Sequence, residues 1–175
     1  MDATEFAERV ASGEKAFPDI ELDGADLAGV DLRQIRLPRS HLTDVDLHGA
    51  NLTLADFAQA RLIRVRLSGA HLFKANFSAA HLVAIDFCAA NLHAANFQGA
   101  NLSNAYLRAA QLTQANLSNA DLTAATLQGA HLTESLFRNS NLSGADLTET
   151  ILSRTNFDGA NLRWAKLPEE FTLGS

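Results

Sequence analysis

The apolar residues of this chain recur with a period of five. Every fifth position from Leu22 to Leu167 is Leu or Phe, thirty times in succession and without an insertion or deletion. This period matches neither the α-helix, with about 3.6 residues per turn, nor the flat strand, with about 2. A fixed short period indicates a repeat protein, in which each unit buries its apolar side chain only by stacking on its neighbours. The chain is therefore expected to form a solenoid.

The phenylalanines indicate how many repeats make one coil. Seven phenylalanines fall in the five-residue register, and six of them differ by multiples of 20, namely Phe17, Phe57, Phe77, Phe97, Phe137 and Phe157, with Phe87 as the exception. A four-sided coil of 20 residues places those six rings on one inner face. Thirty repeats divided among four sides give about 7.5 coils, and at a strand spacing of ~4.8 Å the rod is roughly 36 Å long. The predicted fold class is an all-β solenoid.

Each position of the repeat has a physical role. The residue two before the Leu or Phe is Ala in 19 repeats, which is typical of an inward position with little room, and larger residues such as Val30 and Ile35 also occur there. The residue one before is Asp or Asn in 16 repeats, and these short side chains bond nearby turn backbone. Eight of the ten glycines follow the Leu or Phe by two residues, where a type II turn requires a positive φ. We expect a corner every five residues, with the Asp and Asn outward as structural groups.

Repeats of the form A-(D/N)-L-x-x resemble those of the pentapeptide repeat family. The likeness extends over residues 17–167, and the segment from Ala11 to Phe17 is similar to the lead-in of cyanobacterial members. The resemblance implies a right-handed quadrilateral β-helix. The resemblance also implies one candidate function, since quinolone-resistance members of the family mimic DNA and bind DNA gyrase.

The N-terminal end of a solenoid needs a cap, because it exposes core residues and an unpaired strand edge. Residues 2–12 predict a short α-helix for this purpose. Asp2 is placed as the N-cap, with Glu5 at the capping-box spacing, and Gly13 suits the helix end. Phe6 is expected to face the core.

The residues after the repeats are expected to close or extend the C-terminal end. Pro168 ends the repeat, so the predicted units are an N-terminal cap at 1–16, the β-helix at 17–167 and a C-terminal cap or tail at 168–175. Trp164 occupies an outward corner, whereas Phe171 and Leu173 fall outside the register. These three residues either cap the last coil of a monomer or form the contact of an end-to-end homodimer.

Charge narrows the functional classes. The net charge of −6 at pH 7 argues against direct binding of nucleic acid and against attraction to anionic membranes. No apolar stretch reaches the ~18 residues that a membrane span requires. The first sixteen residues contain four acids and no apolar run, so we expect no signal peptide and a cytoplasmic protein.

No sequence pattern typical of an active site is present. Phosphate-binding, zinc-protease, C-x-x-C and nucleophile-elbow motifs are absent. The histidines do not converge on a metal when folded onto the coil, and the nearest approach is that of His71 and His93, beside Phe73. The pattern places no base near Cys88, the only cysteine. A coil filled by side chains also offers no deep pocket. The chain is therefore predicted to be non-enzymatic, with no catalytic residue, cofactor or metal.

Outward apolar residues indicate where a partner protein binds. Ile63 and Val83 share an outward position on successive coils, and Leu54 and Phe73 occupy neighbouring sites. A contiguous apolar group on a surface suggests a contact site. We therefore take Leu54, Ile63, Phe73 and Val83 as the candidate partner surface.

Two classes of function remain. The first is a protein-interaction or structural scaffold module whose protein partner is unidentified, and the second is the gyrase-binding DNA mimic. Three departures disfavour the mimic: the negative charge is mild and forms no single stripe, no loop interrupts the coils, and no long helix follows residue 167. The arginines at 33–39 and 61–66 have aspartates nearby. We interpret them as a mixed-charge wall, with a partner patch as the alternative.

Overall fold

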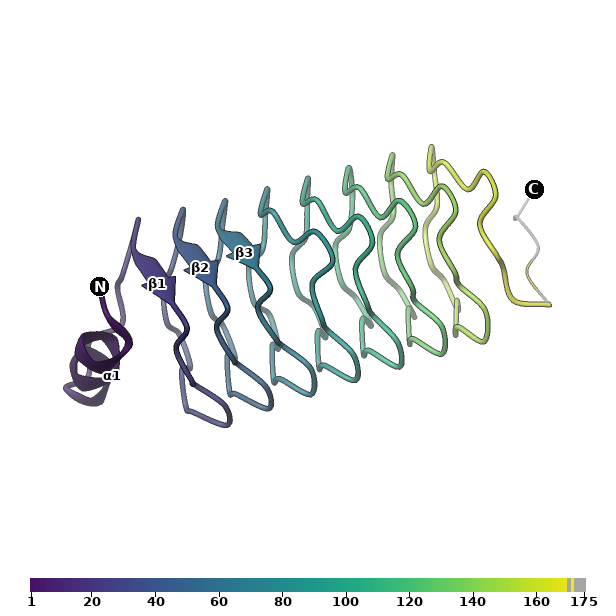
Figure 1. The fold of residues 1–175 in the computed structure, drawn as a ribbon. Coiled ribbons are helices and arrows are strands. Elements are labelled where there is room, and N and C mark those ends of the chain that lie inside the picture. Colours follow the sequence, from purple (N-terminus) through teal and green to yellow (C-terminus); the bar gives the residue numbers. More distant parts are fainter. Residues whose placement is uncertain (170, 172–175) are drawn as a thin grey trace.

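A row of stacked coils with one helix at its N-terminal end makes up the structure, a computed structural model that describes residues 1–169 and 171 (Figure 1). Helix α1 spans Ala3–Ala11. Three short strands follow, β1 at Glu21–Asp23, β2 at His41–Thr43 and β3 at Arg61–Ile63. They form a parallel sheet in the order β1-β2-β3.

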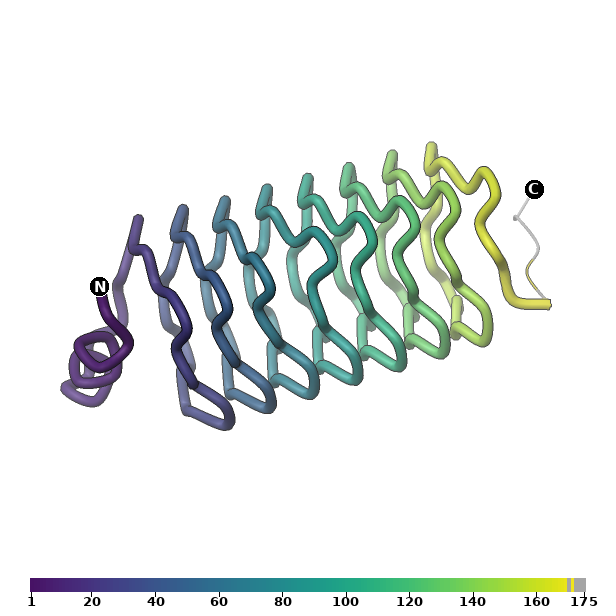
Figure 2. The backbone as a smooth tube through the Cα atoms, viewed as in Figure 1, coloured from purple at the N-terminus to yellow at the C-terminus, as the bar shows by residue number. Residues whose placement is uncertain are grey.

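The register of this sheet continues along the chain with a spacing of 20 residues. Glu21 pairs with His41 and His41 with Arg61, and single bridges keep the same spacing as far as Asp146 and Lys166. Bridges begin at every fifth residue, so a length of 20 residues carries four of them. Figure 2 shows the resulting succession of turns, with the two ends of the chain at opposite ends of the row. The 20-residue spacing predicted from the phenylalanines is thus the spacing of the ladder.

The interior is filled by the two inward residues of each repeat. The Leu or Phe of every repeat from Leu22 to Leu147 is at most 5% exposed, and most of the residues two positions earlier are equally buried. Val30 departs from its predicted inward burial, because it is 36% exposed. The residue 20 positions before it, Val10, belongs to α1 rather than to a coil. No preceding coil therefore covers Val30.

Inward hydroxyl groups are satisfied by backbone carbonyls close by. Ser135 Oγ donates to Leu132 O at 2.6 Å, and Ser140 Oγ donates to Phe137 O at 2.8 Å. Among the described residues, no buried side-chain nitrogen or oxygen lacks a hydrogen-bond partner. The interior is consequently a solid core of side chains without an unpaired polar group.

The corners are turns whose third residue is left-handed. Ala50 N–H donates to Leu47 O across one such turn, and Gly49 within it has φ of 63°. Gly49 N–H also donates to Ser68 O in the next coil. Positive φ was expected where Gly or Asn stands, but Ala109 and Trp164 adopt it too, at 55° and 59°. Ala109 N–H donates to Gln128 O in the next coil, so hydrogen bonds between coils favour the turn there without Gly or Asn.

Helix α1 covers the N-terminal end as the sequence predicts. The Asp2 side chain accepts a hydrogen bond from Glu5 N–H at 2.8 Å, which satisfies a donor that the helix leaves free. Gly13, with φ of 94°, follows the last turn. Phe6 is fully buried, and its ring centroid lies 4.8 Å from that of Phe17. The helix thereby joins the core of the solenoid.

The C-terminal end is less completely covered. Leu152, Phe157 and Leu162 are only partly buried. Phe171 turns back toward them, because its N–H donates to Pro168 O and its ring meets that of Phe157 edge-on, at 5.8 Å. Leu173, which was predicted to act with Phe171, lies outside the described residues.

Candidate protein-interaction surfaces

The outward Asp and Asn residues of the repeats stabilise the turns that follow them. Asn91 Oδ1 accepts from His93 N–H at 3.2 Å, and Asp86 Oδ1 accepts from Cys88 N–H at 3.0 Å. Some also bond to a neighbouring coil, as Asn76 does by donating to Asp56 Oδ1 of the preceding coil at 2.9 Å. This agrees with a structural role for the column, since these oxygens are engaged in holding the backbone.

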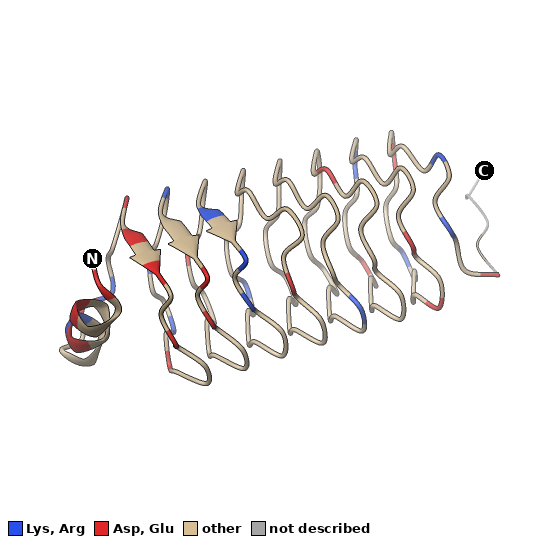
Figure 3. Cartoon of the chain, in the orientation of Figure 1, with Lys and Arg blue, Asp and Glu red and all other residues tan. Residues whose placement is uncertain are grey.

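Acidic and basic residues lie on successive coils (Figure 3), and several of them form ion pairs across neighbouring coils. The bidentate contacts of Arg39 with Asp19 and of Arg64 with Asp44 each join residues 20 positions apart. The hydrogen bonds from Arg64 hold the pKa of the Asp44 carboxyl below its usual range. Arg66 pairs with Asp46 in the same way, at 3.1 Å. The arginines of 61–66 are thus largely matched by acids, as a mixed-charge wall requires.

The four residues of the candidate partner surface separate into two pairs. Leu54 N–H donates to Phe73 O at 2.9 Å, so these two lie on adjacent coils. The bridge between Arg61 and His81 likewise sets Ile63 beside Val83. Phe73, however, is ten residues from both Ile63 and Val83, which is half of the 20-residue coil. The structure therefore brings together two apolar pairs on different sides of the solenoid.

The side that carries Leu54 and Phe73 also presents a pair of stacked rings. The Phe73 and His93 rings are parallel within 4°, with centroids 5.5 Å apart. Lys74 Nζ lies 5.2 Å from the centroid of the Phe73 ring, within cation–π distance. Leu54 is 46% exposed. His93 is thus packed against an aromatic ring of the neighbouring coil.

Trp164 is the most exposed large apolar residue of the described chain. Its side chain is 76% exposed, and the Arg163 guanidinium lies 4.4 Å from the centroid of its ring. Phe171, the other predicted end residue that is described, contacts Phe157 instead. The structure therefore does not bring Trp164 and Phe171 together as one contact group.

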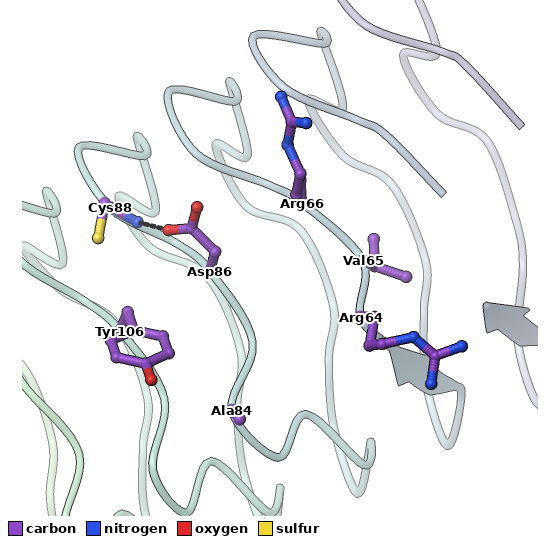
Figure 4. Close-up of a pocket in the computed structure, with 7 residues that line it drawn as sticks. All are labelled: Arg64, Val65, Arg66, Ala84, Asp86, Cys88 and Tyr106. Atoms are coloured by element: carbon purple, nitrogen blue, oxygen red, sulfur yellow. Dashed lines mark hydrogen bonds between the residues drawn. The ribbon is translucent and has the colours of Figure 1, made fainter. Parts of the chain in front are cut away.

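A shallow depression crosses three successive coils (Figure 4) and includes Arg64 and Ala84, the residues that follow Ile63 and Val83 in the chain. Its volume is about 370 Å³, and it is lined by Arg64, Val65, Arg66, Ala84, Asp86, Cys88 and Tyr106. Tyr106, at one end, is 50% exposed. The sequence pattern predicts an outward Tyr106, one residue before Leu107, but does not by itself single out its contact with Asp86. The signal that joins them is their separation of 20 residues.

The groups in this depression do not suggest catalysis. Burial, together with the adjacent Asp86 carboxylate, raises the pKa of the Cys88 thiol. A thiol with a raised pKa is a poor nucleophile, because the thiolate is the reactive form. Within residues 1–169 and 171, no three His, Cys, Asp or Glu side chains gather as a metal ion would require. In the same part of the chain, no helix has the length and apolar character needed to cross a membrane.

A ladder of parallel bridges around a filled interior defines a β-solenoid built from five-residue units. The pentapeptide repeat family model, described as eight copies of the repeat, matches residues 20–57, 100–139 and 130–167. A second model, described as a pentapeptide repeat region, matches residues 40–117. The chain belongs to the pentapeptide repeat family.

Several solved structures are similar to this chain. HetL, a pentapeptide repeat protein involved in heterocyst differentiation regulation in the cyanobacterium Nostoc sp. strain PCC 7120, is 26% identical, with 95% of this chain and 94% of HetL covered and a TM-score of 0.38. Rfr23 from the cyanobacterium Cyanothece 51142 is 21% identical, with coverage of 94% and 98% and a TM-score of 0.41. QnrB1, a plasmid-mediated fluoroquinolone resistance protein, is 18% identical, with coverage of 90% and 85% and a TM-score of 0.40. No curated protein sequence matches the chain.

Proposed function

We propose that this protein is a non-enzymatic module that presents rigid outer faces to a protein partner. The observation that carries the proposal is the division of labour within each repeat. Inward positions are filled by a narrow set of residues, mainly Leu, Phe and Ala with some Val, Ile, Ser and Thr, whereas the outward positions vary widely in charge and size. A filled solenoid leaves no enclosed pocket for a substrate, so its chemistry is that of its surface.

The partner-binding residues proposed are the two outward apolar pairs. Exposed apolar side chains grouped on adjacent coils are typical of contact sites. The Ile63 and Val83 side is the stronger candidate, because Val83 is 48% exposed and the exposed Tyr106 is close by. Tyrosine and arginine are enriched at the centres of protein interfaces, and Arg64 and Arg66 border the same depression.

A capture experiment with matched surface variants tests this proposal. The immobilised protein is incubated with lysate of its source cells, and retained proteins are quantified by mass spectrometry. Ile63→Ser/Val83→Ser should abolish retention of a stoichiometric partner, while Leu54→Ser/Phe73→Ser should leave it unchanged. Equal melting temperatures of the variants and the parent protein exclude unfolding as the cause. Retention of the same proteins by both double variants would refute the proposed surface.

The fold and domain details of the proposal follow the repeat. The solenoid is proposed to be a right-handed quadrilateral β-helix of about 7.5 coils, from thirty repeats with four per coil. The proposed units are a cap at 1–16, the β-helix at 17–167 and a cap or tail at 168–175. Bridges at every fifth residue support four sides per coil, and right-handed crossovers are the rule for parallel strands. An experimentally determined structure at high resolution tests both handedness and coil number.

DNA mimicry of the gyrase-binding kind is the alternative function. It requires acids that are free to replace phosphates, but several outward acids are engaged by cations of neighbouring coils, as Asp44 is by Arg64 and Glu134 by Arg154. A gyrase supercoiling assay with and without a fluoroquinolone distinguishes the two functions. We expect no inhibition and no protection from the drug at low micromolar protein. Either effect would replace the interaction-module proposal by the mimic.

The oligomeric state proposed is a monomer, with the end-to-end homodimer as the alternative. Phe171 rests on Phe157, which supports local capping of the last coil. The exposed ring of Trp164 is the feature that favours a dimer. Light scattering at high protein concentration decides between them, because an end-to-end dimer doubles the mass and Trp164→Ser should return it to that of the monomer.

A further inference from the structure

The depression in Figure 4 has an imbalance of charge along one ladder of the solenoid. Bridges connect Asp46 with Arg66, Arg66 with Asp86, and Asp86 with Tyr106. Asp26 also bridges Asp46, so from residue 26 to residue 106 this row holds three acids and one cation. The cation is committed to Asp46, because the ion pair of Arg66 with Asp46 measures 3.1 Å. Among the described residues, no cation lies within ion-pair distance of Asp86.

The neighbouring arginines point away from the open part of the depression. In Figure 4 the side chains of Arg64 and Arg66 extend away from Tyr106. Arg64 is held there by its bidentate contact with Asp44. Of the other lining residues, Ala84 and Tyr106 are exposed, whereas Asp86 and Cys88 are half-buried. The free surface is thus apolar, acidic at its centre and aromatic at one end.

We propose that this depression receives an arginine side chain of the partner protein. The guanidinium pairs with the free oxygen of Asp86, whose other oxygen already accepts the Cys88 N–H. Adjacent positions of a ladder are about 4.8 Å apart, so the same guanidinium lies against the Tyr106 ring as a cation–π contact. The methylene stem of the arginine covers Ala84, as long basic side chains do on apolar surfaces. This inference rests on the proposed function and names the chemistry of the partner.

Charge and shape both favour arginine over other occupants. An acidic side chain would meet Asp86, and a purely apolar one would leave that carboxylate desolvated without a counter-ion. Arginine has a flat fork that suits a carboxylate and an aromatic ring together. Arg108 lies two residues beyond Tyr106 and close to Cys88. Its positive charge repels a second cation that approaches from this end of the depression. The guanidinium therefore enters from the side of Ala84.

The inference is tested by titrating a capped five-residue peptide, with arginine at its centre and leucine on both sides, into the full ¹⁵N-labelled chain. Amide shifts should concentrate at residues 84–88 and at Tyr106. A peptide with citrulline in place of arginine has the same shape without the charge, and it should bind at least about tenfold more weakly. Shifts spread over all outward carboxylates, or equal binding of the two peptides, would refute the pocket.

Two variants locate the charge that is used. Asp86→Asn preserves the acceptor for Cys88 N–H, because Asn fills the equivalent position in many repeats, and it should weaken peptide binding about tenfold. Arg108→Gln should strengthen binding. Asp121→Asn is the matched control on another side and should change nothing. If Asp86→Asn binds as tightly as the parent chain while the Ile63→Ser/Val83→Ser variant still loses its partner, the arginine pocket is wrong and the interaction module stands. If Asp86→Asn leaves peptide binding unchanged and Ile63→Ser/Val83→Ser also leaves partner retention unchanged, the interaction module is refuted as well.

Discussion

The rings of Phe57 and Phe77 lie parallel, with planes 2° apart and centroids separated by 5.1 Å. Phe97 continues the stack at the same separation from Phe77. The two coils that carry Phe57 and Phe77 are therefore joined by ring contact inside as well as by hydrogen bonds outside. Phe87, which breaks the 20-residue pattern of phenylalanines, meets Phe77 edge-on at 5.5 Å. It reaches the stack from the opposite inner face.

Replacing a stacked ring should cost stability in proportion to the rings that it touches. Phe77 has three ring neighbours among the described residues, and Phe137 has one. An aromatic pair contributes about 0.5–1.5 kcal/mol beyond the area buried. Phe77→Leu should therefore reduce the free energy of unfolding by about 1–3 kcal/mol more than Phe137→Leu, as measured by urea denaturation. Equal losses would mean that the stack contributes nothing beyond burial.

The inward alanine column should not accept a larger side chain. Ala115 is fully buried between coils, and added methylene groups in a close-packed interior force neighbours off their preferred positions. Ala115→Leu should lower the free energy of unfolding by about 1–3 kcal/mol. An unchanged melting temperature would contradict the tight packing of this column.

Asn101→Ala is the matched control for the inward column. Asn101 is partly exposed, and its Oδ1 accepts from the backbone and the hydroxyl of Ser103. Water replaces these bonds at an exposed site, so the loss should be about 0.5–1 kcal/mol. If Asn101→Ala lowered the free energy of unfolding as much as Ala115→Leu does, the Asn side chains would contribute more to stability than their exposure suggests.

Two corner glycines should differ in their tolerance of alanine. Gly129 and Gly159 have φ of 69° and 68°, so Gly→Ala costs about 1–2 kcal/mol at either. A Cβ at Gly129 meets no atom within 4 Å, whereas at Gly159 it collides with Asn139 Oδ1. Gly159→Ala should therefore destabilise more, as measured by urea denaturation.

A double-mutant cycle isolates the contact with Asn139. In an Asn139→Ala background, Gly159→Ala should cost no more than Gly129→Ala costs in the parent chain. If the larger loss persisted without the Asn139 side chain, the collision would not be its cause.

Acid should remove the stabilisation that comes from ion pairs between coils. Arg64 lowers the pKa of Asp44 in the folded chain. A carboxyl group with a lowered folded pKa stabilises the fold above its unfolded pKa, about 3.9. That contribution is lost as the pH falls through the folded pKa. Arg64→Gln should therefore melt slightly below the parent chain at neutral pH and together with it at about pH 2.5.

Salt provides the control for this pH dependence. Both charges of the pair are exposed, so about 1 M NaCl should screen the pair and bring the two melting temperatures together at neutral pH. A difference that survives both acid and salt would have to come from the packing of the arginine stem and not from its charge.

The sequence by itself determined the repeat, the 20-residue spacing and the inward residues. It also located helix α1 and its Asp2 cap. These features were predictable because a five-residue unit leaves few ways to bury Leu, Phe and Ala, and because capping depends on residues close together in the chain. The left-handed corners were predictable where Gly or Asn marks them.

The tertiary structure alone decided which outward residues become neighbours. It separated Leu54 and Phe73 from Ile63 and Val83, and it exposed Val30, because helix α1 stands where a preceding coil would have covered it. It also directed Arg64 to Asp44 and Arg66 to Asp46. Outward side chains are free to differ from coil to coil, so no period records them. Their contacts depend on how the coils stack and on the conformation that each long side chain adopts.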